Sequence, residues 1–306
     1  VLDSQAIKSE LARTRFTGDL RDFQLQNLGR LLLLPHGANF SVPGAGKTMV
    51  SLALYELIRA RELVEQLLVV APLSAFEAWK QEALERFSPP LKVCAYLQGP
   101  IPSCEVLLVN YHRLASQYEA LTHWVGRGKT HVILDEAHRV KKGRDGVHGN
   151  AALDLAIYAA RRDILTGTPA PQGPSDLLAL FEFLWPGQGN LVLPNAVTSR
   201  GASSVVEVTR EKISGLFVRT TKQQLDLPAT KFQVEKVPMG PVQSAIYSAL
   251  KGQFRGTFTL NTSDKTRLRE LGRASMYLIE AAVNPALLLS GSSDEDMPPF
   301  RHPPLP

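Results

Sequence analysis

Short runs of apolar residues alternate along the chain with longer segments whose apolar residues recur every three or four positions. A continuous apolar run that ends at a turn is typical of a strand buried in a parallel sheet. We expect such strands within residues 37–42, 65–72, 91–97, 105–110, 131–138 and 162–169. Segments with helical spacing lie around them, over 11–34, 49–58, 74–87, from 111 onward, 151–161 and 175–184. This alternation predicts an α/β fold, with a mostly parallel sheet flanked by helices.

The last third of the chain has a different pattern. Residues 187–215 are weakly patterned, 217–222 form a short basic element, and 232–238 alternate like an exposed strand or an extended link. Helices are predicted over 241–254 and 266–282, and the Ser-, Asp- and Pro-rich residues 290–306 are typical of disorder. We therefore divide the chain into a helical lead-in (1–19), an α/β domain (20–186), the rest of that domain with a helical C-terminal extension (187–289), and a tail (290–306).

Composition adds few constraints. The sequence has 306 residues, of which 44% are hydrophobic, and this is enough for a large core. No apolar run reaches the ~20 residues of a membrane span, and Val1–Gln5 do not resemble a signal peptide. The two cysteines, Cys94 and Cys104, have no metal-binding spacing, so we expect reduced thiols. A net charge of +5 is compatible with a polyanionic partner but is weak evidence for one.

The strongest chemical signal is the segment Ser41–Thr48, which reads Ser-Val-Pro-Gly-Ala-Gly-Lys-Thr. It lies between a predicted strand and a predicted helix, as a phosphate-binding loop requires. Its glycines let backbone N–H groups turn toward phosphate oxygens, and the helix adds its positive N-terminal end. We expect Lys47 to contact the outer phosphates and the Thr48 hydroxyl to bind Mg²⁺. The candidate nucleotide contacts here are Ser41, Val42, Pro43, Gly44, Ala45, Gly46, Lys47 and Thr48.

The second strong signal is the pair of acids that follows the apolar run of residues 131–134. We expect Asp135 to hold Mg²⁺ through a water, and Glu136 to deprotonate the water that attacks the terminal phosphate. His138 is a candidate phosphate sensor. Downstream, Thr166 and Thr168 follow another predicted strand, and their hydroxyls are candidates for passing the state of the acidic segment onward.

Gln24 is the candidate reader of the base. A side-chain amide donates and accepts hydrogen bonds together, which suits the N7 and exocyclic amine of adenine. Gln24 lies in a predicted helix just upstream of the glycine-rich loop. A solvated helix face is an equally good explanation of this segment.

Several polar residues follow the other predicted strands and are candidates for nucleic-acid contact, because the carboxyl ends of parallel strands form the ligand edge of an open sheet. They are Ser74, Lys80, Asn110, Tyr111, Arg113, Lys141 and Lys142. For the lysines, an ordinary solvated surface is the competing explanation. Trp79 falls on the apolar face of its helix with Phe76 and Ala83, so we expect it in the core rather than stacked on a base.

The order of these motifs resembles the Swi/Snf-type group of superfamily-two helicase-like ATPases. The segment Asp135–His138 matches the DEAH box of that family. The other segments that resemble family motifs are 20–24, 41–48, 71–80, 108–111, 165–169, 183–186, 217–222 with 227–228, and 284–287. The chain departs from the pattern at Phe23, where Tyr is usual, at Ser41, where the strict loop has Gly, and in lacking the usual acidic residue and leucine of that loop.

The resemblance implies a RecA-like P-loop NTPase domain that binds ATP and Mg²⁺ and has double-stranded DNA as its partner. It also implies a second RecA-like lobe, and no segment of this sequence resembles one. We therefore expect this chain to bind Mg·ATP and to hydrolyse it slowly, because an arginine finger in related NTPases accelerates hydrolysis by about 10³–10⁵.

The function expected from the resemblance is ATP-driven translocation on double-stranded DNA. An ATP-gated DNA-binding or scaffold module without motor activity, and a strand-separating helicase, stay open as alternatives. The resemblance further suggests a cytoplasmic, bacterial, nucleoid-associated protein without a membrane segment.

Overall fold

The computed structural model describes residues 3–189, 211–225, 233–253, 265–286 and 288. The chain forms two compact units, Val1–Pro228 and Ala229–Pro306, and each is described by itself. The predicted tail, 290–306, lies outside the described residues, as do 190–210 of the weakly patterned stretch and Leu227 and Pro228.

Unit 1 is built on a seven-stranded sheet in which every described pair of strands is parallel. The order across the sheet is β3-β4-β2-β5-β6-β1-β7. The strands are β1 (Gly37–Asn39), β2 (Gln66–Val70), β3 (Val93–Ala95), β4 (Val106–Val109), β5 (Thr130–Asp135), β6 (Arg161–Leu165) and β7 (Phe217–Val218). The predicted α/β fold with a parallel sheet is confirmed.

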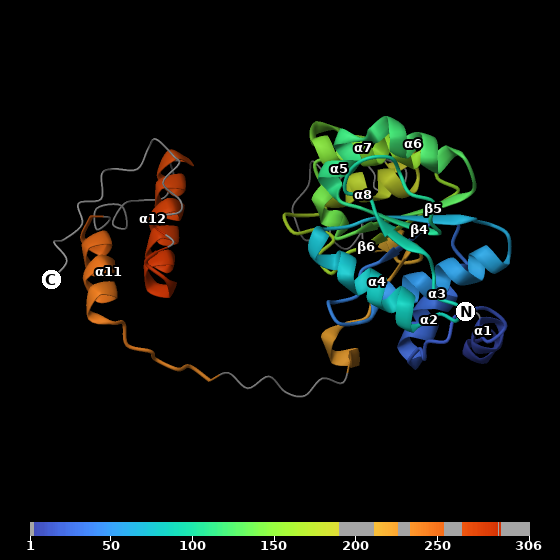
Figure 1. The fold of residues 1–306 in the computed structure, drawn as a ribbon, viewed down its shortest axis with the longest axis horizontal. Helices are drawn as coiled ribbons and strands as arrows, with labels where there is room; N and C mark the ends of the chain where they lie inside the picture. Colours follow the sequence, from blue (N-terminus) through green and yellow to red (C-terminus); the bar gives the residue numbers. More distant parts are fainter. Residues whose placement is uncertain (1–2, 190–210, 226–232, 254–264, 287, 289–306) are drawn as a thin grey trace. The chain divides into compact units, whose positions relative to one another are not determined.

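Helices cover both faces of this sheet, which explains the uninterrupted apolar runs of its central strands. On one face lie α1 (Ser4–Leu11), α2 (Asp22–Leu32), α3 (Lys47–Ala60) and α4 (Phe76–Glu85). On the other lie α5 (Tyr111–Ser116), α6 (Tyr118–Gly126), α7 (Val147–Ala156) and α8 (Asp176–Leu184). Figure 1 shows these two layers with the strands between them.

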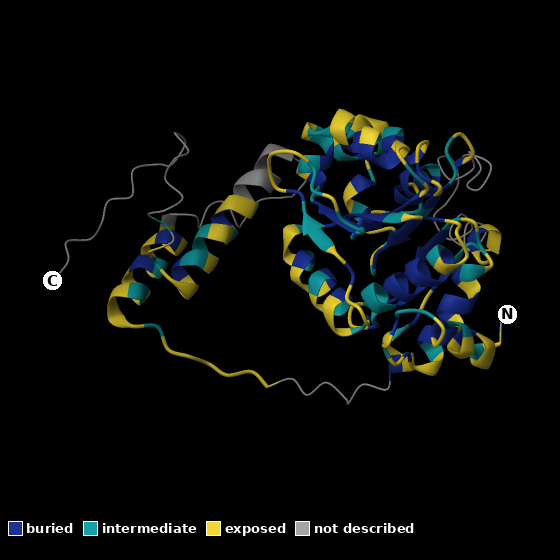
Figure 2. Cartoon of the chain, turned by 45° about the vertical axis from the view of Figure 1, so that its right-hand side comes forward, coloured by how far each residue is buried: buried dark blue, intermediate teal, exposed yellow. Residues whose placement is uncertain are grey.

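The side chains of each central strand alternate between the two layers. In β2, Leu67 and Val69 pack into the cluster under α1–α4, whereas Leu68 and Val70 pack into the cluster under α5–α8. All four are fully buried, and Figure 2 shows buried strands between helices whose outer faces are exposed. Because successive side chains of a strand point to opposite faces, each central strand contributes to both hydrophobic cores.

Two strands differ from the prediction. The strand expected over 91–97 is only Val93–Ala95, half-buried at the edge of the sheet. The basic element 217–222 contributes β7, which pairs with β1 at the opposite edge. Beyond β1 the chain stays extended, because the N–H groups of Phe40 and Val42 donate to the carbonyls of Val218 and Thr220.

Unit 2 contains two helices, α11 (Pro241–Gln253) and α12 (Lys265–Val283), close to the predicted ranges. Ile246, Leu250 and Ala281 form their buried contact. The Gln243 side-chain amide donates to the carbonyls of Ala281 and Ala282 near the end of α12, at 3.1 and 2.7 Å. Residues 233–238, predicted as a strand or a link, have no regular secondary structure and are exposed. In the described parts of both units, no helix is both long and apolar enough to cross a bilayer.

Candidate nucleotide-binding site

The register of the sheet places the glycine-rich loop and the acid pair at the same edge. Strands β1 and β5 both pair with β6, and Leu165 of β6 is the register partner of both Asn39 and Asp135. The carboxyl ends of β1 and β5 are therefore level, and two strand spacings of ~4.8 Å separate them by about 10 Å. Both segments leave the sheet side by side, at the edge where open α/β sheets bind ligands.

The loop has the backbone conformation that a phosphate site needs. Gly44 and Gly46 have φ angles of 83° and 73°, in the left-handed region that glycine enters without strain. A Cβ on Gly46 would also lie 2.2 Å from the Gln24 side-chain nitrogen, so both the φ angle and this close approach exclude a side chain at this position. Helix α3 begins directly after Gly46, at Lys47, and its first-turn N–H groups have no carbonyl partners within the helix.

Lys47 lies inside this loop. Its Nζ donates to the carbonyls of Ser41 and Val42, at 3.1 and 3.4 Å. Burial lowers the pKa of Lys47, while the charges of Glu136 and Asp135 act in the opposite direction. The two acids are thus near enough to influence the lysine, which is the convergence that the sequence predicts.

A chain of buried hydrogen bonds, which sequence reasoning missed, holds the start of the loop. The Ser41 N–H donates to Asn39 Oδ1 at 3.1 Å, and Ser41 Oγ accepts from the N–H of Thr220 at 2.9 Å. The Thr220 hydroxyl accepts in turn from Asn27 Nδ2 at 2.8 Å. Asn27, Asn39, Ser41 and Thr220 are all buried. Buried polar residues among apolar neighbours were the available signal, but their partner lies 193 positions away from Asn27 in the sequence.

Gln24 lies against the loop as expected, but its amide is occupied. Its side-chain oxygen accepts from the Arg21 N–H at 2.9 Å, and its nitrogen donates to the Ala45 carbonyl at 3.2 Å. The residue is 5% exposed. In this arrangement Gln24 braces the glycine-rich loop, and contact with a base requires at least one of these bonds to be exchanged.

Asp135 accepts three hydrogen bonds through its carboxylate and its main-chain carbonyl. Its Oδ2 accepts from the indole N–H of Trp79 at 3.0 Å, and its Oδ1 accepts from the N–H of Glu136 at 2.9 Å. Its main-chain carbonyl accepts from the Tyr111 hydroxyl at 2.7 Å. Burial raises the pKa of Asp135, and the Trp79 hydrogen bond lowers it again. The sequence places Trp79 correctly in the core, where it is 1% exposed, but does not reveal this bond.

Glu136 has a strained backbone, with φ 52° in the left-handed region that few non-glycine residues adopt. Such outliers persist where the surrounding structure holds them and are concentrated at functional sites. The Glu136 carboxylate lies 3.2 Å from His138 Nδ1, and that nitrogen is also 3.2 Å from the Thr166 hydroxyl. The same hydroxyl accepts from the N–H of Thr168 at 3.2 Å. The structure therefore brings Glu136 and Thr166 together at the His138 ring, and Thr168 joins them through its backbone N–H rather than its hydroxyl.

The residues present fit Mg²⁺ held together with a phosphate ligand. Mg²⁺ usually keeps several waters and binds one or two carboxylates plus substrate phosphates, rather than a cage made only of protein groups. The described residues contain no cluster of three or more His, Cys, Asp or Glu side chains that could hold a metal ion. They do offer the Asp135 carboxylate, with lone pairs left beyond its two hydrogen bonds, and the Thr48 hydroxyl, for which no described residue is a partner.

The candidate nucleic-acid contacts lie at the neighbouring half of the same edge, after β2, β4 and β5. Ser74 is exposed, and Lys80 forms an ion pair with Glu77 at 2.7 Å. Asn110 caps α5 by accepting from the Arg113 N–H at 2.7 Å, and the Arg113 guanidinium lies over the Tyr96 ring, 5.7 Å from its centroid. Lys142 is exposed and Lys141 is half-buried.

Tyr111 does not reach the surface with these residues. It is 3% exposed, and its hydroxyl is bound to the Asp135 carbonyl. Its position suits support of the acid better than contact with a polyanion.

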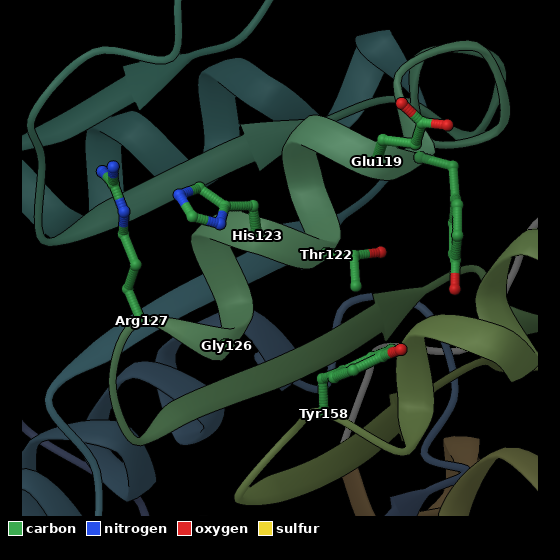
Figure 3. A pocket seen from close by; sticks show the side chains of 7 residues that line it. Glu119, Thr122, His123, Gly126, Arg127 and Tyr158 are labelled. Atoms are coloured by element: carbon green, nitrogen blue, oxygen red, sulfur yellow. The ribbon is translucent and has the colours of Figure 1, made fainter.

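A separate hollow of about 560 Å³ lies on α6, where Thr122, Arg127 and Tyr158 are among the lining residues (Figure 3). Arg127 precedes the first residue of β5 and Tyr158 precedes the first residue of β6. Because all these strands are parallel, the hollow is at the amino edge of the sheet, opposite the loop and the acids. It is not part of the candidate nucleotide site.

Comparison with known proteins identifies the family. The family described as "SNF2-related domain" matches residues 41–284. This chain belongs to the SNF2-related domain family.

A chromodomain-helicase-DNA-binding protein 1-like of Danio rerio is 27% identical over 248 residues, which are 74% of this chain and 23% of that protein. The SWI/SNF chromatin-remodeling complex subunit snf22 of Schizosaccharomyces pombe is 26% identical over 305 residues, covering 88% of this chain and 18% of the relative. The chain thus spans about a fifth of the length of these curated relatives.

A solved structure, titled "Sulfolobus solfataricus SWI2/SNF2 ATPase core in complex with dsDNA", matches with a TM-score of 0.59 and 20% identity. The match covers 92% of this SNF2-related chain and 62% of the other. At this identity the likeness establishes the fold, and the expected RecA-like architecture is confirmed.

The relatives overturn one expectation. The resemblance suggested a cytoplasmic, bacterial, nucleoid-associated protein, but the curated relatives named above are eukaryotic, and another at 26% identity is named Nuclear protein STH1/NPS1, from Saccharomyces cerevisiae. The bacterial assignment was wrong because it relied on resemblance between motifs, and motif content does not report the organism or the compartment.

Proposed function

We propose that this SNF2-related chain is the ATP-binding lobe of a DNA-dependent ATPase that couples Mg·ATP hydrolysis to movement on double-stranded DNA. The observation that carries the proposal is the shared register of Asn39, Leu165 and Asp135, which brings Lys47 and both acids to one edge of the sheet. The family match and the relatives' names support the same class of activity.

Each group at this edge has a task in phosphoryl transfer. The N–H groups after Gly44 and the Lys47 ammonium bind and orient the phosphates of ATP. Burial lowers the pKa of Lys47, and a phosphate anion would favour its charged form. Thr48 and Asp135 would hold Mg²⁺, which would supply positive charge against the outer phosphates. Glu136 takes the proton from the attacking water, and His138 holds the Glu136 carboxylate in place and connects it to Thr166.

The polar residues after β2, β4 and β5 form the proposed DNA surface. Ser74, Lys80, Asn110, Arg113, Lys141 and Lys142 would contact the phosphate backbone, so affinity should fall steeply with salt and depend little on base sequence. Gln24 would read the adenine if its bonds to Arg21 and Ala45 are exchanged when the nucleotide binds.

The decisive test is ATP hydrolysis with and without duplex DNA, for the wild type and Glu136→Gln. Loss of a general base typically costs 10²–10⁴ in rate, so we expect turnover to fall by roughly that factor while nucleotide binding persists. Glu119→Gln, on the exposed surface of α6, is the matched control and should behave as the wild type. Equal hydrolysis by the wild type and Glu136→Gln would remove Glu136 from the mechanism.

The kind of movement needs its own measurement. Displacement of a third strand from a triplex reports translocation along a duplex, whereas separation of the duplex itself reports helicase activity. In a protein that carries this lobe together with a second RecA-like lobe, we expect ATP-dependent triplex displacement without duplex unwinding. Unwinding at a comparable rate would favour a strand-separating helicase, and DNA binding with neither activity would favour a scaffold.

A further inference from the structure

Two buried aromatic residues from opposite faces of the sheet donate hydrogen bonds to Asp135. Trp79 of α4 donates its indole N–H to Oδ2 at 3.0 Å, and Tyr111 of α5 donates its hydroxyl to the main-chain carbonyl at 2.7 Å. Trp79 belongs to the core under α1–α4, and Tyr111 belongs to the core under α5–α8. Asp135 is thus connected to both layers of the domain.

Each donor is next to residues proposed to contact DNA. Trp79 directly precedes Lys80, in the helix that follows Ser74. Tyr111 lies between Asn110 and Arg113, at the first position of α5. A displacement of either helix by a bound polyanion therefore acts on a group that is hydrogen-bonded to Asp135.

The two bonds affect Asp135 differently. The Trp79 N–H stabilises the ionised carboxylate and so lowers the pKa that burial raises; among the charged groups facing it, Lys47 also lowers that pKa and Glu136 raises it. The pKa of Tyr111 is raised well above its ordinary value, first by burial and then by the charge of Asp135, so its hydroxyl keeps its proton and stays a donor. The Trp79 bond orients the Asp135 carboxylate, and the Tyr111 bond fixes the position of its main-chain carbonyl.

We propose that Trp79 and Tyr111 are positioning residues that transmit DNA contact at α4 and α5 to the metal-binding carboxylate of Asp135. This inference rests on the proposed function and goes beyond it, because it names the groups that make nucleotide binding respond to DNA. A role in packing alone would stabilise the domain without changing how nucleotide affinity responds to DNA.

The test uses two substitutions that remove a donor and keep a ring, Trp79→Phe and Tyr111→Phe. Trp124→Phe and Tyr55→Phe are matched controls: both residues are buried, and the Tyr55 hydroxyl donates to the Glu65 carbonyl rather than to an acid of the site. The measurement is the Mg²⁺-dependent affinity for a fluorescent ATP analogue at a single pH, with and without duplex DNA. It needs no turnover.

In both Trp79→Phe and Tyr111→Phe we expect the DNA-induced change in Mg²⁺-dependent nucleotide affinity to be reduced at least about threefold, because each substitution removes one hydrogen bond that connects a helix to Asp135. Both controls should match the wild type.

The possible failures are distinguishable. A wild type that binds no nucleotide would remove the proposed function and the inference with it. A wild type whose nucleotide affinity responds to DNA, with both variants indistinguishable from their controls, would overturn only the inference. An equal loss of the DNA response in Trp124→Phe would assign the effect to loss of core packing.

Discussion

The two edges of the sheet both carry charged groups but use them in opposite ways. At the amino edge, Arg161 of β6 holds Asp163 with two bonds, from Nε at 2.7 Å and Nη2 at 3.2 Å. Its remaining donors reach the carbonyls of Leu31 and Leu34, and the Asp163 carboxylate also accepts from His131. Arg161, Asp163 and His131 are 7%, 3% and 0% exposed, so this network is closed to ligands.

At the carboxyl edge the charged groups are left partly open. The Lys47 ammonium is held only by two carbonyls of its own loop, Glu136 is half-buried on a strained backbone, and no described residue binds the Thr48 hydroxyl. A buried charge whose partners are all protein groups contributes to the folded state, whereas one without an ionic partner is available to a ligand. Charged groups at the amino ends of the strands therefore stabilise the fold, whereas those at the carboxyl ends are available to bind a ligand.

The largest effect on folding should come from the amino edge. Asp163→Ala leaves the Arg161 guanidinium buried without its anion, and breaking such a pair typically costs about 3–5 kcal/mol. Asp154→Ala removes the partner of the exposed Arg144, a pair 2.6 Å apart, and should cost far less stability because solvent screens an exposed pair. Urea denaturation of both variants measures the difference.

Asp163→Asn keeps a hydrogen-bond acceptor for Arg161 and should fall between the two. It also provides a readout if the alanine variant does not fold. If the Asp163 variants lose no more stability than Asp154→Ala, the buried network does not stabilise the fold.

At the carboxyl edge, removing a charge should leave folding almost intact and abolish the response to ligand. A ligand that binds only the folded state stabilises it by about 2.7 kcal/mol at a concentration of 100 Kd. We expect Lys47→Ala to change the stability of the free protein by less than about 1 kcal/mol and to lose most of this gain. Thermal unfolding with and without Mg·ATP tests this, with Lys80→Ala as a control that keeps the gain. Retention of the full gain in Lys47→Ala would place the phosphates elsewhere.

The comparison also shows which features of the fold and the site can be predicted from neighbouring residues in the sequence. The apolar runs before Asp135 and Asn110 predict buried parallel strands, and the glycines of the loop predict its turn, because these features depend on neighbouring residues. The helical spacing of Trp79 with Phe76 and Ala83 correctly predicts a buried face. Short-range patterns were sufficient to locate the candidate site.

What the sequence could not predict depends on pairs far apart in the chain. The Asn27–Thr220 bond, the Trp79–Asp135 bond and the Arg161–Leu31 bond join residues separated by 193, 56 and 130 positions. Each depends on the order of strands across the sheet, which places β2 beside β5, β6 beside β1 and β1 beside β7. The buried use of Tyr111 was missed for the same reason, since position after a strand indicates the ligand edge but not whether the side chain faces outward.

The predicted effect that is smallest at neutral pH is a pH dependence at the amino edge. Burial, followed by the charge of Arg162, lowers the pKa of His36 from 6.5 to about 4. Between about pH 6.5 and pH 4, His36 is therefore protonated in the unfolded chain but neutral in the folded chain. The free energy of unfolding falls as the pH falls through this window.

His36→Asn should make the decline of unfolding free energy between pH 6.5 and 4 shallower. The pKa of His131 is also lowered, chiefly by burial, and its contribution has the same sign, so the variant should keep part of the slope. The exposed His123, changed to Asn, is the control. Denaturant titrations at several pH values measure the slope, and equal slopes for the wild type and His36→Asn would show that His36 titrates alike in both states.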